Sequence, residues 1–225
     1  MSAKENAAME ALKYVKAGQT IGLGTGSTAA LFIQLLAKKA KEEKLEIKCV
    51  PTSIESKALA YSLGLHLLEP SEVKAIDVAV DGADLVDAKL NLIKGGGGAH
   101  VREKAIDYFA KKFIVIVDDS KISKSLKGPI PLEILPFAFP FVEKVLKNGL
   151  KVKVELRRKG NGDVFISDNG NFIADAQIKA ILNPAKLEDQ LNSIPGIVGN
   201  GIFSKNVSAV IVGYSKKVMV LRKRA

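Results

Sequence analysis

Charged residues flank a run of glycines in the stretch IKGGGGAHVREK, from Ile93 to Lys104. Lys94 precedes four consecutive glycines, Gly95–Gly98, and Glu103 follows them in a segment with helical spacing. Glycines let the backbone approach a ligand without intervening side chains. The dipole of a helix favours a carboxylate in its first turns, and a nearby cation can stabilise a developing oxyanion. These residue types are suited to proton transfer beside a carbonyl group.

Two other polar residues of this stretch have structural interpretations. A single histidine near a helix start, such as His100, is more often a surface or capping residue than an acid–base group. Arg102 shares a helical face with Ala99, Ile106 and Phe109, so it is a candidate for structural pairing. We therefore assign neither residue to the chemistry.

The segment GLGTGST, from Gly22 to Thr28, places a glycine-rich turn between a buried strand and a helix. Such a turn leaves backbone N–H groups available for an anion, and Thr25, Ser27 and Thr28 add hydroxyl donors. A dinucleotide-binding turn would have a third glycine in place of Ser27, and the lysine of a phosphate loop is missing. A single phosphate on a small molecule therefore fits better than a nucleotide, with a plain tight turn as the alternative.

Two carboxylates, Asp81 and Asp84, directly follow the apolar strand pattern AIDVAV. Ligands of open α/β sheets bind beyond the carboxyl ends of the strands. Two neighbouring acids can acquire different pKa values and divide the acid and base roles. The alternative is ordinary turn chemistry, and we assign Asp87 to a turn or cap.

Strand and helix patterns alternate through the first half of the chain. Strands are predicted at TIGLG, EIKCV, AIDVAV, KLNLI and KFIVIVD, a helix over Ser27–Lys41, and a helix cap at Ser53. Nearly continuous apolar strands that alternate with helices indicate a parallel sheet covered on both faces. The three polar clusters would then meet at one edge of one sheet.

The pattern changes at the proline-rich segment GPIPLEILPFAFP, which we interpret as a domain boundary. A helix is predicted over Phe141–Lys147, and strands at LKVKVELR, DVFIS and FIADAQI are separated by Asn-Gly turns. Another helix is predicted near Pro184–Asn192, and the strands VSAVIVGY and KVMVLR can rejoin the first sheet. The predicted domains are therefore residues 1–128 with 206–225, and residues 129–205.

The composition is that of an ordinary globular protein, with 47% hydrophobic and 26% charged residues. No apolar run approaches the ~20 residues that span a bilayer, and the N-terminus lacks the apolar core of a signal peptide. Cys49 is the only cysteine, which excludes intrachain disulfides and cysteine clusters for metals. We expect a cytoplasmic protein.

The chain carries 34 basic and 24 acidic residues, a net charge of +10. Nucleic-acid binding, attraction of a small anion, or a solvated lysine-rich surface would each account for it. Lys38, Lys39, Lys41 and Lys44 surround the polar end of one predicted helix, as a solvated surface would. Neither an aromatic-rich strand nor a zinc-ligand spacing accompanies the charge, so nucleic-acid binding is the weaker interpretation.

Taken together, the motifs GLGTGST, VDGAD, KGGGGA with REK, DDSK, SDNGN and PGIVGNGIF resemble the type A ribose-5-phosphate isomerase family over nearly the whole chain. That family interconverts ribose 5-phosphate and ribulose 5-phosphate through an enediol, without metal or cofactor. The resemblance implies a Rossmann-like α/β domain with an inserted ferredoxin-like α+β domain for lid closure or oligomerisation. It also implies a homodimer or homotetramer that binds a sugar phosphate, and neither nucleic acid nor a membrane.

The resemblance further implies roles for residues at matching positions. Glu103 would move the proton between C1 and C2, Asp81 would assist ring opening and proton movement, and Lys94 would stabilise the oxyanion. Asp84 would bind sugar hydroxyls or support Lys94. The implied substrate-binding residues are Thr25, Gly26, Ser27, Thr28, Asp81, Gly82, Ala83, Asp84, Lys94, Gly95, Gly96, Gly97 and Lys121.

The chain departs from the family pattern at three positions without an implied catalytic role. Leu85 and Gly199 stand where the family has or often has Glu, and His100 interrupts a usual aliphatic pair. Two other functions compete with isomerisation: a non-catalytic sugar-phosphate-sensing module on the same scaffold, and a basic nucleic-acid-binding protein. The joint presence of Glu103 and the other catalytic residue types favours the isomerase.

Overall fold

The computed structural model describes residues 1–223 and divides into two compact units. The first contains Met1–Ala83, Arg102–Ile122 and the residues from Asn206 onward, and the second contains Asp84–Val101 and Ser123–Lys205. The predicted fold class, an α/β unit interrupted by a smaller α+β unit, is confirmed. The compact units differ from the predicted domain boundaries because residues 84–101 and 123–128 group with the second unit.

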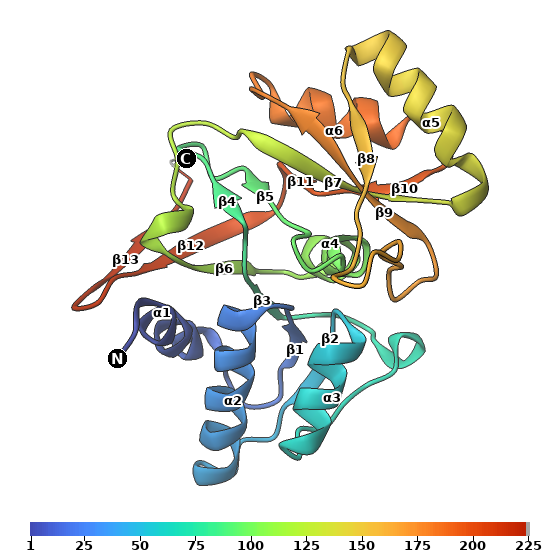
Figure 1. The fold of residues 1–225 in the computed structure, drawn as a ribbon. Helices are drawn as coiled ribbons and strands as arrows, with labels where there is room; N and C mark the ends of the chain where they lie inside the picture. Colours follow the sequence, from blue (N-terminus) through green and yellow to red (C-terminus); the bar gives the residue numbers. More distant parts are fainter. Residues whose placement is uncertain (224–225) are drawn as a thin grey trace. The chain divides into compact units, whose positions relative to one another are not determined.

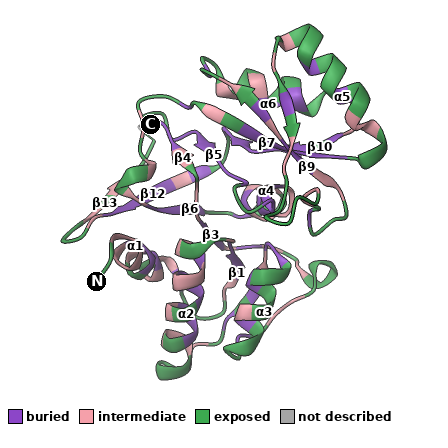
Figure 2. Ribbon diagram, viewed as in Figure 1, coloured by how far each residue is buried: buried purple, intermediate pink, exposed green. Residues whose placement is uncertain are grey.

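A six-stranded sheet forms the first unit, in the order β13-β12-β6-β3-β1-β2 (Figure 1). All neighbouring strands pair in parallel except β13, which is antiparallel to β12. The central strands consist almost entirely of buried apolar residues (Figure 2), as a sheet covered on both faces requires. The strands are β1 (Thr20–Leu23), β2 (Lys48–Pro51), β3 (Val78–Asp81), β6 (Phe113–Asp118), β12 (Val207–Gly213) and β13 (Val218–Leu221).

Four α-helices accompany this sheet: α1 (Ala3–Ala11), α2 (Ser27–Glu42), α3 (Ile54–Ser62) and α4 (His100–Phe109), of which α4 begins in the second unit. The prediction of a helix from Ser27 is confirmed, and so is the cap at Ser53, whose hydroxyl accepts a hydrogen bond from Ser56 N–H. Short 3-10 turns occupy Leu12–Tyr14, Pro70–Glu72 and Asp119–Lys121. The return of β12 and β13 to the first sheet is also confirmed.

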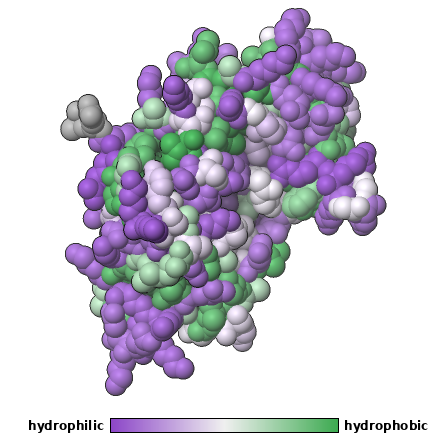
Figure 3. Space-filling model, turned by 60° about the vertical axis from the view of Figure 1, so that its left-hand side comes forward, coloured by the Kyte–Doolittle hydropathy of each residue, from purple (hydrophilic) through white to green (hydrophobic). Residues whose placement is uncertain are grey.

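Lysines at the end of α2 form a solvated surface, as predicted. Lys38 pairs with Glu42 and Lys39 with Glu43, one helical turn apart. Lys41 is exposed to solvent. Figure 3 shows hydrophilic side chains gathered at the bottom of the view, where α2 ends in Figure 1.

The second unit contains a four-stranded antiparallel sheet in the order β10-β7-β9-β8, together with helices α5 and α6. Its strands are β7 (Gly128–Ile134), β8 (Val154–Leu156), β9 (Phe172–Ile178) and β10 (Ile197–Asn200). Helix α5 (Phe139–Val145) follows a 3-10 turn at Pro136–Ala138 and continues as a π-helical turn over Leu146–Leu150, and α6 spans Pro184–Asn192. A separate apolar core holds this unit together.

Two expectations for the second unit are corrected. The proline-rich segment lies inside the second unit, which already includes Ser123, and its residues Gly128–Ile134 form strand β7. The strand tolerates Pro131 because its carbonyl accepts a hydrogen bond from Gly201 N–H, so the missing N–H lies on the side away from β9. DVFIS forms only isolated bridges, at Val164 and Ile166, although the DNGN turn beside it closes as expected through Ser167 N–H and Asn171 O.

KLNLI does not belong to the parallel sheet, so the expectation that all three polar clusters end parallel strands is wrong. Its residues Leu92–Ile93 form β5, the central strand of a three-stranded antiparallel sheet with β4 (Leu85–Val86) and β11 (Ile202–Phe203). The side chain of Asp87 accepts hydrogen bonds from the N–H groups of Lys89 and Asn91 and turns the chain back onto β4. The assignment of Asp87 to a turn is confirmed.

Helix α4 is anchored at its end within the first unit. Asn206, in the left-handed conformation, donates hydrogen bonds from its amide to the carbonyls of Asp107, Tyr108 and Ala110. These carbonyls have no partner within the helix itself. The loop before β12 thereby fixes the helix that carries Glu103.

Candidate active site

Asp81 organises the first part of the candidate site, at the carboxyl ends of β1 and β3. Its side chain is fully buried, and one oxygen accepts hydrogen bonds from Thr25 N–H at 3.0 Å and Gly82 N–H at 2.6 Å. A Cβ at Gly24 would overlap this carboxylate, which explains why glycine precedes Thr25. The structure therefore brings GLGTGST and DGAD together, as the parallel pairing of their strands requires.

The hydroxyl of Thr25 contacts two side chains at the start of α3, of which only Ser53 was singled out from the sequence, as a helix cap. It lies 2.7 Å from the hydroxyl of Thr52 and donates to Ser53 Oγ at 2.8 Å. Both partners are buried at the start of α3. Thr25 consequently links the glycine turn to α3, in addition to offering its backbone to Asp81.

The beginning of α2 offers backbone donors. Gly26 is its N-cap, with φ of 99°, and no side chain caps the helix there. The N–H groups of the first turn, over Ser27 and Thr28, are therefore oriented toward the helix entrance. A phosphate group is well suited to this position.

Lys4 and Lys121 bring positive charge close to Asp118 in the first unit. Lys4 donates from Nζ to Ser27 Oγ at 2.9 Å. Burial raises the pKa of Asp118, but hydrogen bonds from Ser120 and the charges of Lys121 and Lys4 outweigh it, so the pKa lies below its ordinary value. Lys121 was predicted from the family resemblance to contact the substrate. Lys4 was not predicted, because it lies 23 residues before Ser27 in the sequence.

The glycine run forms a tight loop in the second unit. Gly98 N–H donates to Gly95 O at 2.9 Å, and Gly96 N–H donates to the Asp84 side chain at 2.7 Å. Gly95 has a φ of 99°, a conformation that other residues rarely adopt. The loop thus joins two of the predicted clusters, DGAD and KGGGG, through the Asp84 carboxylate.

Arg157 holds this loop from outside the motif. Its guanidinium donates to the carbonyls of Gly95 and Gly96, both at 2.9 Å, and forms a two-pronged ion pair with Asp175 at 2.6 and 2.9 Å. The ring of Phe165 lies 5.9 Å from the guanidinium. A planar group with several fixed donors is needed for this geometry. Arg157 could not be assigned to this loop from the sequence because it lies 62 residues from Gly95.

Three ionisable side chains of the predicted site are buried. Glu103 is 5% exposed and lies in the first turn of α4, and Lys94 is 2% exposed, with Nζ 5.5 Å from the centre of the Phe203 ring. Asp81 is the third. Acidic and basic residues are rarely buried so completely unless they are paired or functional. A low local dielectric also strengthens the interactions of these charges with a ligand.

The expectation that His100 lies at the surface is wrong. Its ring is fully buried, and a Cβ added to Gly95 would come within 2.7 Å of His100 Nδ1. His100 therefore packs beneath the glycine loop and supports its shape. Position 95 therefore requires glycine for two reasons: the His100 ring leaves no space for a Cβ, and the backbone has a positive φ.

Within residues 1–223, no helix is long and apolar enough to cross a membrane. No group of three or more His, Cys, Asp or Glu side chains in the described chain is arranged to hold a metal ion. The arrangement offers instead backbone and lysine donors for an anion, and buried carboxylates for proton transfer.

The family model for ribose 5-phosphate isomerase A (phosphoriboisomerase A) matches residues 48–217. A ribose-5-phosphate isomerase A from Methanococcus aeolicus is 50% identical over 97% of this chain and 94% of its own. One from Methanothermobacter thermautotrophicus is 44% identical over 99% of this chain and 98% of its own.

Solved structures agree with these sequence relatives. A D-ribose-5-phosphate isomerase in complex with phospho-erythronic acid has a TM-score of 0.94 at 46% identity, covering 98% of this chain and 97% of its own. The ribose 5-phosphate isomerase from Plasmodium falciparum has a TM-score of 0.93 at 33% identity, covering 99% of both chains. The fold is therefore shared over nearly the whole length.

We expect Arg157→Lys to loosen the glycine loop, because lysine keeps the charge but cannot reach both carbonyls and Asp175 with fixed donors. Amide hydrogen exchange at Gly96 and Gly98, followed by mass spectrometry, should become about tenfold faster, which corresponds to one charge-assisted hydrogen bond. Arg158→Lys is the matched control, since Arg158 is exposed and its guanidinium donates locally, to Gly162 O. An unchanged amide exchange rate in Arg157→Lys would refute the role of Arg157 in holding the glycine loop.

Proposed function

Because the chain belongs to the ribose 5-phosphate isomerase A family, we propose that Glu103 is the base of the family's aldose–ketose interconversion. The chain is an isomerase that interconverts D-ribose 5-phosphate and D-ribulose 5-phosphate. The observation that supports the role of Glu103 is its burial in the first turn of α4, on a helix that Asn206 fixes at its other end.

The proposed reaction moves one proton between two carbons. In the open-chain aldose, Glu103 takes the proton from C2, and the electrons of that bond form the C1–C2 double bond of an enediolate. The proton on the C2 oxygen passes to the C1 oxygen, a transfer that we assign to Asp81. The protonated Glu103 then gives its proton to C1, the C1–C2 double bond becomes single, and the carbonyl forms at C2. The base needs a fixed position beside both carbons, which a helix supplies better than a loop.

Lys94 and the two aspartates would act on the sugar oxygens. We assign to Lys94 the stabilisation of the enediolate oxygen, since a buried ammonium group acts strongly on developing negative charge. Asp81 would move protons at the oxygens and assist ring opening, with its other oxygen held by the backbone of Thr25 and Gly82. Asp84 would bind sugar hydroxyls while it orders the glycine loop through Gly96.

We assign the phosphate to the beginning of α2. Backbone donors of Gly26, Ser27 and Thr28 support this assignment, as do the positive charges of Lys4 and Lys121. The remaining predicted substrate contacts, Gly82, Ala83 and the amides of Gly95–Gly97, would surround the sugar.

The proposal also covers the cofactor requirement, the compartment and the binding partners of the enzyme. We propose that the reaction needs neither metal nor cofactor, because Lys94 supplies the positive charge that a metal would otherwise bring to the oxyanion. We also propose that the protein acts in the cytoplasm and binds neither nucleic acid nor membranes. The alternative of a non-catalytic sensing module is not favoured, since relatives at 44% to 50% identity are named as isomerases.

We expect Glu103→Gln to lower kcat for ribose 5-phosphate by about 10² to 10⁴, the typical contribution of a general base, with little change in KM. Ketose formation is followed in buffer with a chelator, where the unmodified enzyme should keep its activity. Glu55→Gln, in the first turn of α3, is the matched control and should be fully active. Near-normal turnover in Glu103→Gln, with an unchanged thermal unfolding curve, would exclude the proposed base.

We expect Lys4→Gln to raise KM for ribose 5-phosphate about tenfold while kcat stays within about threefold, because one charged contact to the phosphate is lost. Steady-state kinetics of the exposed control Lys16→Gln should match the unmodified enzyme. A KM that is unchanged in Lys4→Gln would remove this lysine from the phosphate site.

We propose a homodimer or homotetramer that associates through the second unit. Phe137 and Phe141 are 86% and 58% exposed, with ring centres 5.9 Å apart, and Val145 continues the same helical face. Exposed apolar groups of this kind mark association surfaces. Sedimentation equilibrium should give a smaller mass for Phe137→Ser with Phe141→Ser, but not for Leu182→Ser, whose side chain is exposed elsewhere in this unit. A monomeric parent enzyme at micromolar concentration would contradict the proposal.

A further inference from the structure

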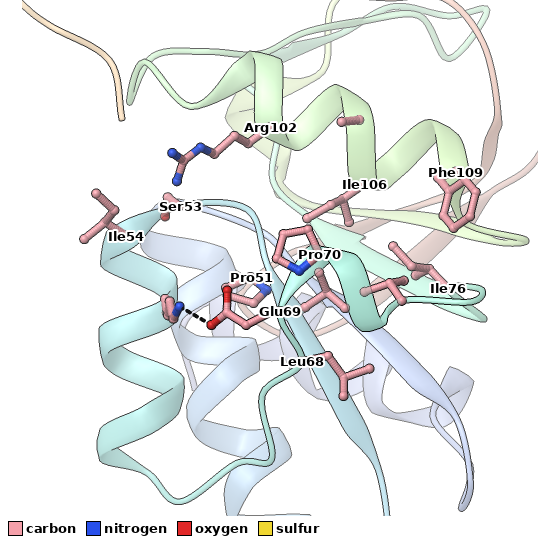
Figure 4. A pocket seen from close by; sticks show the side chains of 14 residues that line it. Pro51, Ser53, Ile54, Leu68, Glu69, Pro70, Ile76, Arg102, Ile106 and Phe109 are labelled. Atoms are coloured by element: carbon pink, nitrogen blue, oxygen red, sulfur yellow. Dashed lines mark hydrogen bonds and ion pairs between the residues drawn. The ribbon is translucent and has the colours of Figure 1, made fainter. Parts of the chain in front are cut away.

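A cavity of 550 Å³ lies within the first unit, apart from the residues assigned to the sugar phosphate. Its walls come from the end of β2, the first turns of α3, the segment between residues 68 and 76, and one face of α4. Figure 4 shows these walls with their side chains. Small-molecule sites typically occupy 300 to 1,000 Å³, so the cavity has the size of a ligand site. It lies at the carboxyl end of β2, where open α/β sheets bind ligands.

The lining separates into an apolar part and a cationic part. Apolar side chains are contributed by α4 at the helical spacing of Ala105, Ile106 and Phe109, and they face prolines and aliphatic residues of the other walls. Figure 4 shows the guanidinium of Arg102 extended toward Ser53 at the beginning of α3. The apolar residues of the other walls are Val50, Pro51, Ile54, Leu68, Pro70, Val73 and Ile76.

Apolar residues at the cavity remain in contact with solvent. Ile54 is 59% exposed and Phe109 is 58% exposed, and they come from two different walls. Large apolar side chains gathered at a concave surface with a few polar groups are typical of binding sites. A second molecule would bury surface that the fold leaves accessible.

The charges of the cavity favour an anion. Lys57 pairs with Glu69 at 2.6 Å, so this pair is nearly neutral, and Arg102 brings a guanidinium group to the lining. The guanidinium has five N–H donors, so it can bind an anion together with another partner. The positive end of the α3 dipole points to the same place.

We propose that this cavity is a second ligand site, which binds a small organic anion with a flat apolar body, such as an aromatic carboxylate or an aryl phosphate. The anionic group contacts Arg102 near the beginning of α3. The apolar body packs between the α4 face, with Ile106 and Phe109, and the opposite wall with Pro51 and Pro70.

Two connections join this site to residues of the proposed mechanism. Ser53 lines the cavity and accepts the hydrogen bond from Thr25 Oγ1, and Arg102 immediately precedes Glu103 on α4. A bound anion that shifts either residue alters the phosphate turn or the base. This regulatory consequence rests on the proposed roles of Thr25 and Glu103, whereas the existence of the second site does not.

Binding is tested directly with 1-naphthoate, by isothermal titration calorimetry of the full chain in saturating ribose 5-phosphate. We expect one saturable site per chain. Arg102→Gln should weaken binding at least about tenfold, and the neutral analogue 1-naphthylmethanol should bind more weakly by a similar factor, because both remove a charge-assisted contact. Ala105→Trp should abolish binding by filling the cavity from an exposed position of α4.

Ala58→Trp is the matched control, because Ala58 is also exposed but does not line the cavity, and it should bind as the unmodified chain does. Thermal unfolding of each variant checks its fold, and Arg102→Gln decides the outcome if Ala105→Trp unfolds. Absence of saturable binding, equal binding by Arg102→Gln, or displacement of 1-naphthoate by ribose 5-phosphate would overturn the proposal. The Glu103→Gln assay remains independent of all these outcomes.

Discussion

A single buried carboxylate fixes the shape of the first unit where β1 and β3 end. Asp81 accepts hydrogen bonds from Thr25 N–H and Gly82 N–H, which ties the end of β3 to the turn that leads into α2. A buried carboxylate without such donors would be strongly unfavourable, so the turn can adopt few other shapes. The absence of a side chain at Gly24 is part of the same constraint, because a Cβ there would overlap Asp81. The position of the α2 N-terminus, with its free backbone N–H groups, depends on this contact.

The glycine loop obeys a comparable constraint in the second unit. Arg157 neutralises Asp175 and at the same time satisfies two carbonyls of the loop, so neither the cation nor the carbonyls lack a partner. His100 fills the space beneath Gly95. The glycines are therefore a rigid, closely packed surface, and the conformational freedom that they lose on folding is offset by these contacts.

Different faces of helix α4 carry Glu103 and line the cavity described above. One face carries Glu103 in a buried position, and a neighbouring face lines the cavity through Arg102, Ala105 and Phe109. Asn206 holds the last turn of the helix. Residues that are adjacent in a helix point about 100° apart, so the proposed base and the cavity lining can come from one helix without sharing side chains. Because Arg102 precedes Glu103 on this helix, a ligand in the proposed second site would act on the proposed base through α4.

The sequence by itself determined the helices, most strands and the residue types for the chemistry. Ser53 as a cap, the helix from Ser27 and the strand 172–178 were found because caps and apolar periods are local signals. The tertiary structure alone decided the partner strands of KLNLI, the burial of His100 and the recruitment of Arg157. These depend on contacts such as that of Arg157 with Gly95, across 62 residues, and local spacing carries no information about such distant pairings.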